Sequence, residues 1–256
     1  MAVLPEDLAR ALQSELSIER AVETGTHIGG GAEKLAGIFP RVISIEVSRE
    51  LHEEAKRRLG GRSSIELLLG DSLDVLPEVR DPDVPTFFWL DGHWTPTDTT
   101  PSADGGGTGV GSVECPVLSE IGLLTEGHAD DCFVVDDARI FAVAPTAPCD
   151  PDQWPSIVEV IDALRAARPE HHVTLAADYV IAVPHRARRI LDEVARTWMT
   201  HQGWATTEEP MELTEEGWVV DRAYEARIEQ RVQERLASEL TRRSLRGRVG
   251  RALGRG

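Results

Sequence analysis

The sequence is poor in cysteine, in lysine and in long apolar runs. Its 256 residues contain three cysteines, Cys115, Cys132 and Cys149, too few and too scattered for a disulfide framework or a cysteine-rich zinc site. The longest apolar runs, such as residues 65–69 and 87–90, are far too short to span a membrane. No basic segment followed by an apolar stretch opens the chain, so we expect no signal peptide and a cytoplasmic location.

Basic residues are also scarce. The chain has 27 Lys plus Arg against 44 Asp plus Glu, a formal charge of −17, and such a surface repels phosphate backbones. We therefore expect no nucleic acid partner. Only two basic residues are lysines, Lys34 and Lys56, and both fall in segments with the pattern of exposed helices. Schiff-base chemistry and phosphate-loop chemistry both need a lysine in the site, so the sequence argues against both.

Short apolar runs alternate with helix-forming segments from residue 20 onward. The expected strands lie near 20–23, 42–46, 65–69, 86–90 and 131–135. The expected helices between them lie near 29–39, 49–59, 72–79 and 115–126. Two further apolar runs within 171–184, separated by Ala177 and Asp178, have the spacing of a hairpin. This alternation predicts an α/β fold with a mostly parallel sheet of seven strands, helices on both faces and an antiparallel last strand.

We predict one domain over residues 1–201, which includes an N-terminal helix near 5–17 and a helix near 185–201, and a C-terminal extension over 202–256. In the extension, apolar residues four apart predict an arginine-rich helix over 225–256. We expect this helix to dock on the body or on a second copy of the chain, with contact to an anionic surface or fraying as alternatives. The glycine-rich loop over 92–114 is either a lid or a passive insertion.

Glycines cluster between the first predicted strand and its helix, in the stretch VETGTHIGGG. They allow close backbone approach to a ligand and leave amide donors free at a helix start. Dinucleotide sites use G-x-G-x-x-G, whereas this stretch is E-x-G-x-x-x-G and begins with Glu23. That acid would repel a pyrophosphate but attract a sulfonium or ammonium group. A glycine-rich turn without a ligand is the alternative, and His27 is a candidate for a polar contact.

Acidic residues end the next two strands. Glu46 ends SIE, 21 positions after Gly25, where a carboxylate suits the hydroxyl groups of a ribose. Asp71 and Ser72 follow LLLG and reach the same sheet edge, where ligands bind in open α/β sheets. Each acid alone would be a helix cap or a solvated charge, but acids at successive strand ends predict a nucleoside pocket.

The series VETGTHIGGG, SIEVS and LGDSLDVL resembles the motifs of S-adenosylmethionine-dependent methyltransferases with the Rossmann-like fold, over about residues 18–185. The resemblance implies a three-layer α/β/α sandwich and S-adenosylmethionine as cofactor. The glycine turn would face the methionine part, Glu46 the ribose, and Asp71 with Ser72 the adenine. The implied cofactor-binding residues are Glu23, Gly25, Thr26, His27, Gly29, Glu46, Asp71, Ser72 and Asp91.

Three carboxylates follow the fourth and fifth strands: Asp91 in LDGHW, and Asp136 with Asp137 in VVDDARIF. Clustered carboxylates are costly unless protonated or joined by a cation, and oxygen ligands favour Mg²⁺. A metal there would orient an acceptor, with Asp91 and His93 as catalytic residues, because histidine ordinarily titrates near neutral pH. The pattern resembles macrocin-type sugar O-methyltransferases, except that a histidine stands where an acid is expected. The alternatives are a turn-capping Asp136 or Asp137 and a plain loop histidine.

The function favoured by these patterns is methyl transfer from S-adenosylmethionine to a hydroxyl of a small molecule, with a sugar or polyol moiety of secondary metabolism as the expected acceptor. A nicotinamide-dependent oxidoreductase is the first alternative, although the G-x-G-x-x-G motif is missing. A non-catalytic protein that binds a nucleoside and acts in assembly through its arginine-rich tail is the second.

Overall fold

The computed structural model of the chain describes residues 4–94, 113–143, 145, 149–201, 211–214 and 217–220. The chain divides into two compact units, Met1–Gln202 and Gly203–Gly256. Most of the predicted loop 92–114, and the predicted helix over 225–256 with its expected role in docking, lie outside the described residues. Within the described part, no helix is both long and apolar enough to cross a membrane.

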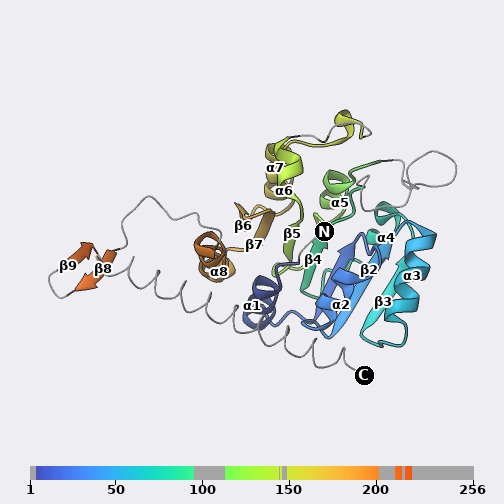
Figure 1. Ribbon diagram of the computed structural model, residues 1–256, viewed down its shortest axis with the longest axis horizontal. Coiled ribbons are helices and arrows are strands. Elements are labelled where there is room, and N and C mark those ends of the chain that lie inside the picture. The colour runs from blue at the N-terminus through green and yellow to red at the C-terminus, as the bar shows by residue number, and fades with distance from the viewer. Residues whose placement is uncertain are drawn as a thin grey trace, which may run out of the picture. The chain divides into compact units, whose positions relative to one another are not determined.

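A seven-stranded sheet forms the centre of the first unit (Figure 1), with the order β3-β2-β1-β4-β5-β7-β6. Its strands are β1 (Arg20–Thr24), β2 (Arg41–Glu46), β3 (Ile65–Leu69), β4 (Thr86–Leu90), β5 (Cys132–Val135), β6 (His171–Ala176) and β7 (Tyr179–Pro184). The first five strands are parallel, and β7 is antiparallel to both β5 and β6. The predicted strands, the hairpin and the single antiparallel strand are confirmed.

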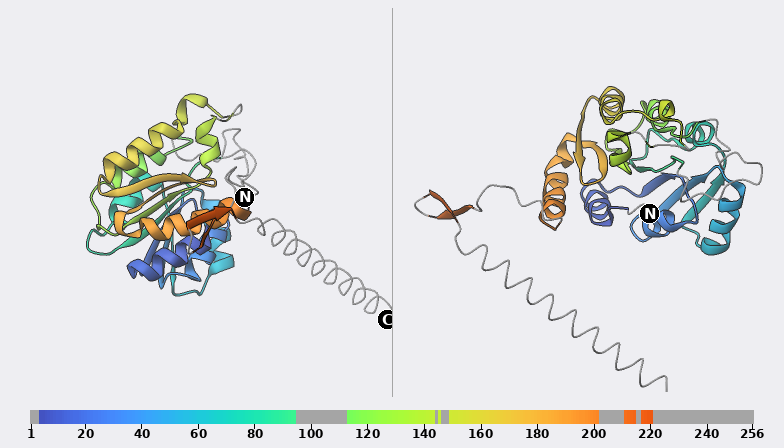
Figure 2. Two further views of the ribbon diagram at one scale, coloured as in Figure 1. Left: turned by 90° about the vertical axis from the view of Figure 1, so that its left-hand side faces the viewer. Right: turned by 45° about the horizontal axis from the view of Figure 1, so that its top comes forward.

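Helices cover both faces of the sheet, as the views in Figures 1 and 2 show. One face carries α1 (Glu6–Leu16), α2 (Gly30–Ala36), α3 (Arg49–Leu59) and α8 (Arg188–His201). The other carries α4 (Ser72–Val79), α5 (Val117–Leu123), α6 (Ala138–Ala142) and α7 (Ile157–Ala167). Two short 3₁₀ turns, η1 (Pro151–Gln153) and η2 (His185–Ala187), precede α7 and α8. The predicted three-layer sandwich is therefore confirmed.

The core consists of two apolar layers, one on each face of the sheet. Alternate strand residues point to opposite faces, so Trp89 packs with the layer under α1 and α2, while Phe88 and Leu90 pack with the layer under α5 and α7. Because both faces are covered, the strands are apolar almost throughout. Among the buried polar side chains of the strands, Glu23, Ser44 and Glu46 lie near the carboxyl ends of β1 and β2.

Helix α7 and the strands of the second unit were not among the elements predicted from sequence. Helix α7 was not predicted, although Ser156 and Glu159 form a capping box at its start. In the second unit the described residues form an antiparallel hairpin, β8 (Met211–Thr214) with β9 (Gly217–Val220). This hairpin was not predicted either.

Candidate functional site

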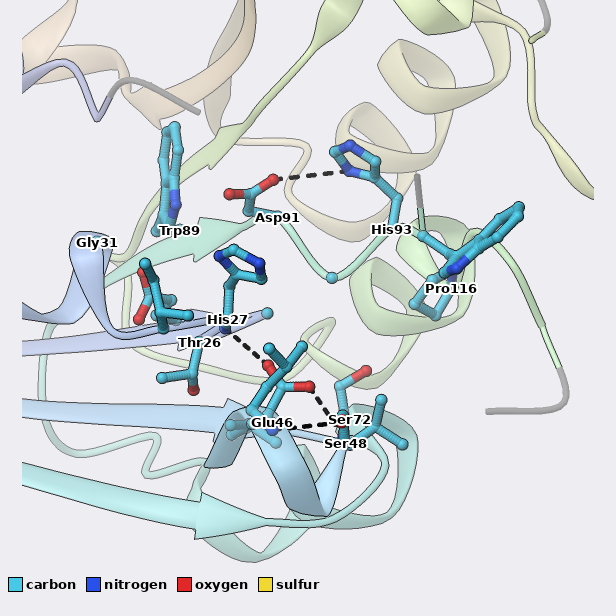
Figure 3. Close-up of a pocket in the computed structure, with 18 of the residues that line it drawn as sticks. Thr26, His27, Gly31, Glu46, Ser48, Ser72, Trp89, Asp91, His93 and Pro116 are labelled. Carbon is cyan, nitrogen blue, oxygen red and sulfur yellow. Dashed lines mark hydrogen bonds and ion pairs between the residues drawn. The ribbon is translucent and has the colours of Figure 1, made fainter. Parts of the chain in front are cut away.

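A cavity of about 630 Å³ opens at the carboxyl ends of the parallel strands (Figure 3). Of the residues predicted from sequence to bind cofactor or acceptor, those that line it are Glu23, Gly25, Thr26, His27, Glu46, Asp71, Ser72, Asp91, His93 and Asp137. Two predicted residues, Gly29 and Asp136, do not line it. Since the crossover connections bring these strand ends to one edge, residues up to 114 positions apart in sequence meet around one volume.

The glycine turn after β1 is built by backbone contacts. Gly25 has φ +83°, and a Cβ there would overlap the carbonyl oxygen of Asp91, with the carbonyl carbon at 2.9 Å. The amides of Gly25 and Thr26 donate to the carbonyl oxygen of Ile45 at 3.0 and 3.1 Å. Only a residue without a side chain allows β1, β2 and β4 to end this close together.

Gly29 and Gly31 have different functions in this turn. Gly29, with φ +86°, precedes α2, and a Cβ there would lie 2.5 Å from Leu59 Cδ1 of α3. The position therefore allows α2 and α3 to pack, and Gly29 does not line the cavity. Gly31 lines the cavity, and a Cβ there would overlap Glu23 Oε1.

Glu23 lies within the protein at the back of this turn, with 1% of its surface exposed. Its Oε2 accepts a hydrogen bond of 2.5 Å from Ser44 Oγ, and Thr26 Oγ1 lies 2.5 Å from the same hydroxyl. Burial raises the pKa of Glu23 to about 8, although hydrogen bonds from Ser44 and the Ala32 amide oppose the shift. Without a cationic ligand, Glu23 is therefore largely neutral at pH 7, which weakens the predicted charge attraction.

Glu46 is held by two backbone amides at the end of β2. His27 N donates to Oε2 at 2.7 Å and Ser48 N donates to Oε1 at 2.8 Å, as the dashed lines of Figure 3 show. Burial raises the pKa of Glu46, while these amides lower it. The Val47 amide lowers it as well. A carboxylate offers about four acceptor positions, so this carboxylate, which lines the cavity and is fixed in orientation, can still accept from a ligand.

Asp71 and Ser72 form the cavity wall at the start of α4. Asp71 is the N-cap, and its side chain accepts a hydrogen bond from Leu73 N at 3.0 Å. The preceding Gly70 amide donates to the Glu46 carbonyl at 2.9 Å, so the two acidic strand ends are joined directly. Asp71 is both a cap and a cavity residue, and the two interpretations considered from sequence are compatible.

Glu120 contacts this wall through Ser72 and was not predicted as a site residue. It is 1% exposed on α5, and burial raises its pKa to about 7, while a hydrogen bond with Ser72 lowers it. Its Oε1 has no hydrogen-bond partner among the described residues, and a Cβ at Gly92 would lie only 3.0 Å away. The signal in the sequence was an acid on the apolar helix face that carries Val117, Ile121 and Leu124.

Asp91, His93 and Asp137 meet at the other end of the cavity. His93 Nε2 lies 3.1 Å from Asp137 Oδ2, and Nδ1 lies 3.7 Å from Asp91 Oδ1 (Figure 3 labels Asp91 and His93). Burial raises the pKa of Asp91 well above its usual range, and the carboxylates of Asp136, Glu23 and Asp137 add to the shift. Burial also acts to raise the pKa of Asp137, but His93 and Arg139 outweigh it and the net shift is downward.

The predicted metal site is not supported by this geometry. Among the described residues, no three His, Cys, Asp or Glu side chains are placed to hold a metal ion together. Asp137 pairs with His93 and with Arg139, whose Nη1 lies 2.7 Å from Oδ1. Asp136 is 2% exposed and lies behind the cavity wall, where burial and the Asp137 charge raise its pKa to about 7. The Arg139 guanidinium and the raised pKa values of Asp91 and Asp136 relieve the repulsion for which a metal was inferred.

Trp94 adds an unsatisfied donor to the cavity. Its ring lines the cavity, and its indole Nε1 is buried without a hydrogen-bond partner among the described residues. Buried N–H groups normally have a partner. Trp89 also lines the cavity, although it is 1% exposed and belongs to the core.

Comparison with known proteins identifies the fold. No family model matches the chain, and no curated protein matches its sequence. Among solved structures, the chain is similar to a "putative caffeoyl-CoA O-methyltransferase" from Staphylococcus aureus, with 15% identity, a TM-score of 0.50, and coverage of 72% of this chain and 84% of that one. A "putative O-methyltransferase" from Klebsiella pneumoniae gives the same identity, TM-score and coverage of this chain, with 81% of that chain covered. At this identity the likeness establishes the Rossmann-like fold.

Proposed function

We propose that this chain is an S-adenosylmethionine-dependent methyltransferase that acts on a hydroxyl group of a small molecule, with a sugar or polyol as the acceptor class. The observation that carries the proposal is the cavity at the strand ends, with the Glu46 carboxylate at one end and the Asp91–His93–Asp137 group at the other. The structural likeness to two proteins described as O-methyltransferases supports the same reaction class.

The residues present fit this cofactor. The volume of about 630 Å³ is in the range of pockets for molecules of this size, roughly 300–1,000 Å³. Glu46 would hold the ribose hydroxyls through its remaining acceptor capacity, and Asp71 with Ser72 would face the adenine. The turn from Gly25 to Gly31 would hold the methionine part. When bound, the cofactor supplies a methyl group that its positive sulfur has already activated.

The protein's own contribution is positioning and proton transfer. His93 lines the cavity beside Asp91 and would take the proton of the acceptor hydroxyl, so that the oxygen becomes a better nucleophile. Alignment of the two reactants can lower the barrier by about 7–11 kcal/mol. The acceptor class follows the resemblance to sugar O-methyltransferases.

Calorimetric titration with S-adenosylhomocysteine and, separately, with NAD tests the proposal. A methyltransferase binds S-adenosylhomocysteine with a stoichiometry of one and binds NAD far more weakly. Binding of NAD in preference to S-adenosylhomocysteine would support the oxidoreductase alternative and refute the proposal. Transfer of a labelled methyl group from S-adenosylmethionine to a panel of sugars and polyols then separates an enzyme from a non-catalytic nucleoside-binding protein.

A further inference from the structure

His93 is held on one side by an acid and is open to the cavity on the other. Its side chain is 7% exposed, its ring lies edge-on to Trp154 with centroids 5.7 Å apart, and Nε2 is in hydrogen-bond contact with Asp137 at 3.1 Å. Nδ1 lies 3.7 Å from Asp91, beyond hydrogen-bond distance. Both His93 and Asp91 line the cavity.

The chemistry of this pair determines which nitrogen carries the proton. An ionised carboxylate can only accept hydrogen bonds, so the contact to Asp137 requires a proton on Nε2. In neutral imidazole the other nitrogen is then an acceptor. Nδ1 of His93, the nitrogen that faces Asp91, is therefore the atom with a free electron pair.

Asp137 itself is fixed in an unusual conformation. It has φ +56°, the left-handed region that non-glycine residues rarely adopt, directly after β5. The turn between β6 and β7 supports it: the Asp178 carbonyl accepts from Ala138 N at 2.9 Å, and Asp178 Oδ1 accepts from Arg139 N at 3.0 Å. The Arg139 guanidinium then bridges the carboxylates of Asp137 and Asp178. Such local strain persists where surrounding contacts impose it.

We propose that Asp137 is a positioning residue, which holds the His93 ring with Nε2 protonated so that Nδ1 can receive the acceptor's proton. Arg139 and Asp178 in turn hold Asp137 in place. The inference rests on the proposed function, in which His93 is the base. It assigns Asp137 a role other than metal binding. The bond that breaks is the acceptor O–H, and its proton goes to Nδ1.

Nuclear magnetic resonance of protein with ¹⁵N-labelled histidine tests this assignment. His93→Gln identifies the His93 signals by their loss. In the wild type we expect the proton on Nε2, seen as a slowly exchanging N–H signal. Asp137→Ala should speed that exchange by at least about tenfold, since a hydrogen bond to a charged group is lost. Asp162→Ala, which removes an exposed carboxylate on α7 in the same unit, should leave the signal unchanged.

Three results would overturn the proposal. The first is a proton on Nδ1 in the wild type, and the second is an unchanged N–H signal in folded Asp137→Ala. The third is loss of the N–H signal when Mg²⁺ replaces EDTA, because Asp137 would then be a metal ligand. The wild-type spectrum alone decides if Asp137→Ala does not fold. S-adenosylhomocysteine affinity, measured on the same samples, separates the two claims. If the wild type does not bind S-adenosylhomocysteine, the proposed function is refuted. If Asp137→Ala binds S-adenosylhomocysteine and its His93 signal is unchanged, only the role of Asp137 is refuted.

Discussion

Replacement of Glu46 by alanine tests the cofactor placement quantitatively. The carboxylate is fixed by His27 N and Ser48 N at 2.7 and 2.8 Å, and it lines the cavity. If it accepts from the ribose hydroxyls, Glu46→Ala removes a hydrogen bond to a charged acceptor, worth about 1.5–3 kcal/mol. The Kd for S-adenosylhomocysteine should then rise by roughly 10- to 160-fold.

Isothermal titration calorimetry measures this change, with Glu66→Ala as the control. Glu66 lies on the neighbouring strand β3, is half-exposed and pairs with Arg41 at the surface, so its loss should leave the affinity within about twofold. A 2′-deoxy analogue of S-adenosylhomocysteine makes the test specific. It should bind the wild type more weakly, and Glu46→Ala should lose little further affinity for it. An equal loss for both ligands, or no loss for either, would refute the ribose assignment.

Three further outcomes follow from the geometry. Gly25→Ala should lower the free energy of unfolding by about 1–3 kcal/mol, because φ is +83° and the new Cβ would overlap the Asp91 backbone. Gly30→Ala, with open space around the new Cβ, should not destabilise the fold. Equal denaturation midpoints for the two variants would contradict this prediction. Burial raises the pKa of Glu23 from 4.5 to about 8, so between these values the folded protein holds a proton that the unfolded chain has released, and stability should fall as the pH rises from about 4.5 to 8. Glu23→Gln should flatten that fall, and a slope equal to the wild type's would remove Glu23 as its cause. Mg²⁺ should leave the melting temperature in EDTA-treated protein unchanged, because Asp137 is paired with Arg139 and His93; a rise with Mg²⁺ concentration would restore the metal site.

The strands, the sheet direction and the acidic strand ends could be predicted from sequence because each depends on local pattern. Apolar runs such as residues 86–90 are typical of buried parallel strands, and Glu46, Asp71 and Asp91 then meet because parallel strands end at one edge. Helix α7 was within reach, since Ser156 and Glu159 have the spacing of a capping box.

The choice of partner within the site could not be predicted. Asp137 pairs with His93 and Arg139 because its backbone is left-handed and the turn at Asp178 supports it, and both features depend on how β7 joins β5. Burial also reversed an argument from charge: Glu23 was expected to offer a negative charge, whereas its desolvation favours the neutral form. The role of Gly29 could not be predicted either, because its contact with Leu59 depends on the packing of α2 on α3.

A crystal structure of the protein with bound S-adenosylhomocysteine would test the proposed function at the level of atoms. We expect the nucleoside in the cavity at the strand ends, with the ribose hydroxyls on the Glu46 carboxylate, the adenine beside Asp71 and Ser72, and the sulfur on the side of Asp91 and His93. A ligand bound outside this cavity, or one whose sulfur lies at the Asp71 end and whose adenine lies against His93, would contradict the proposed function and the role assigned to His93.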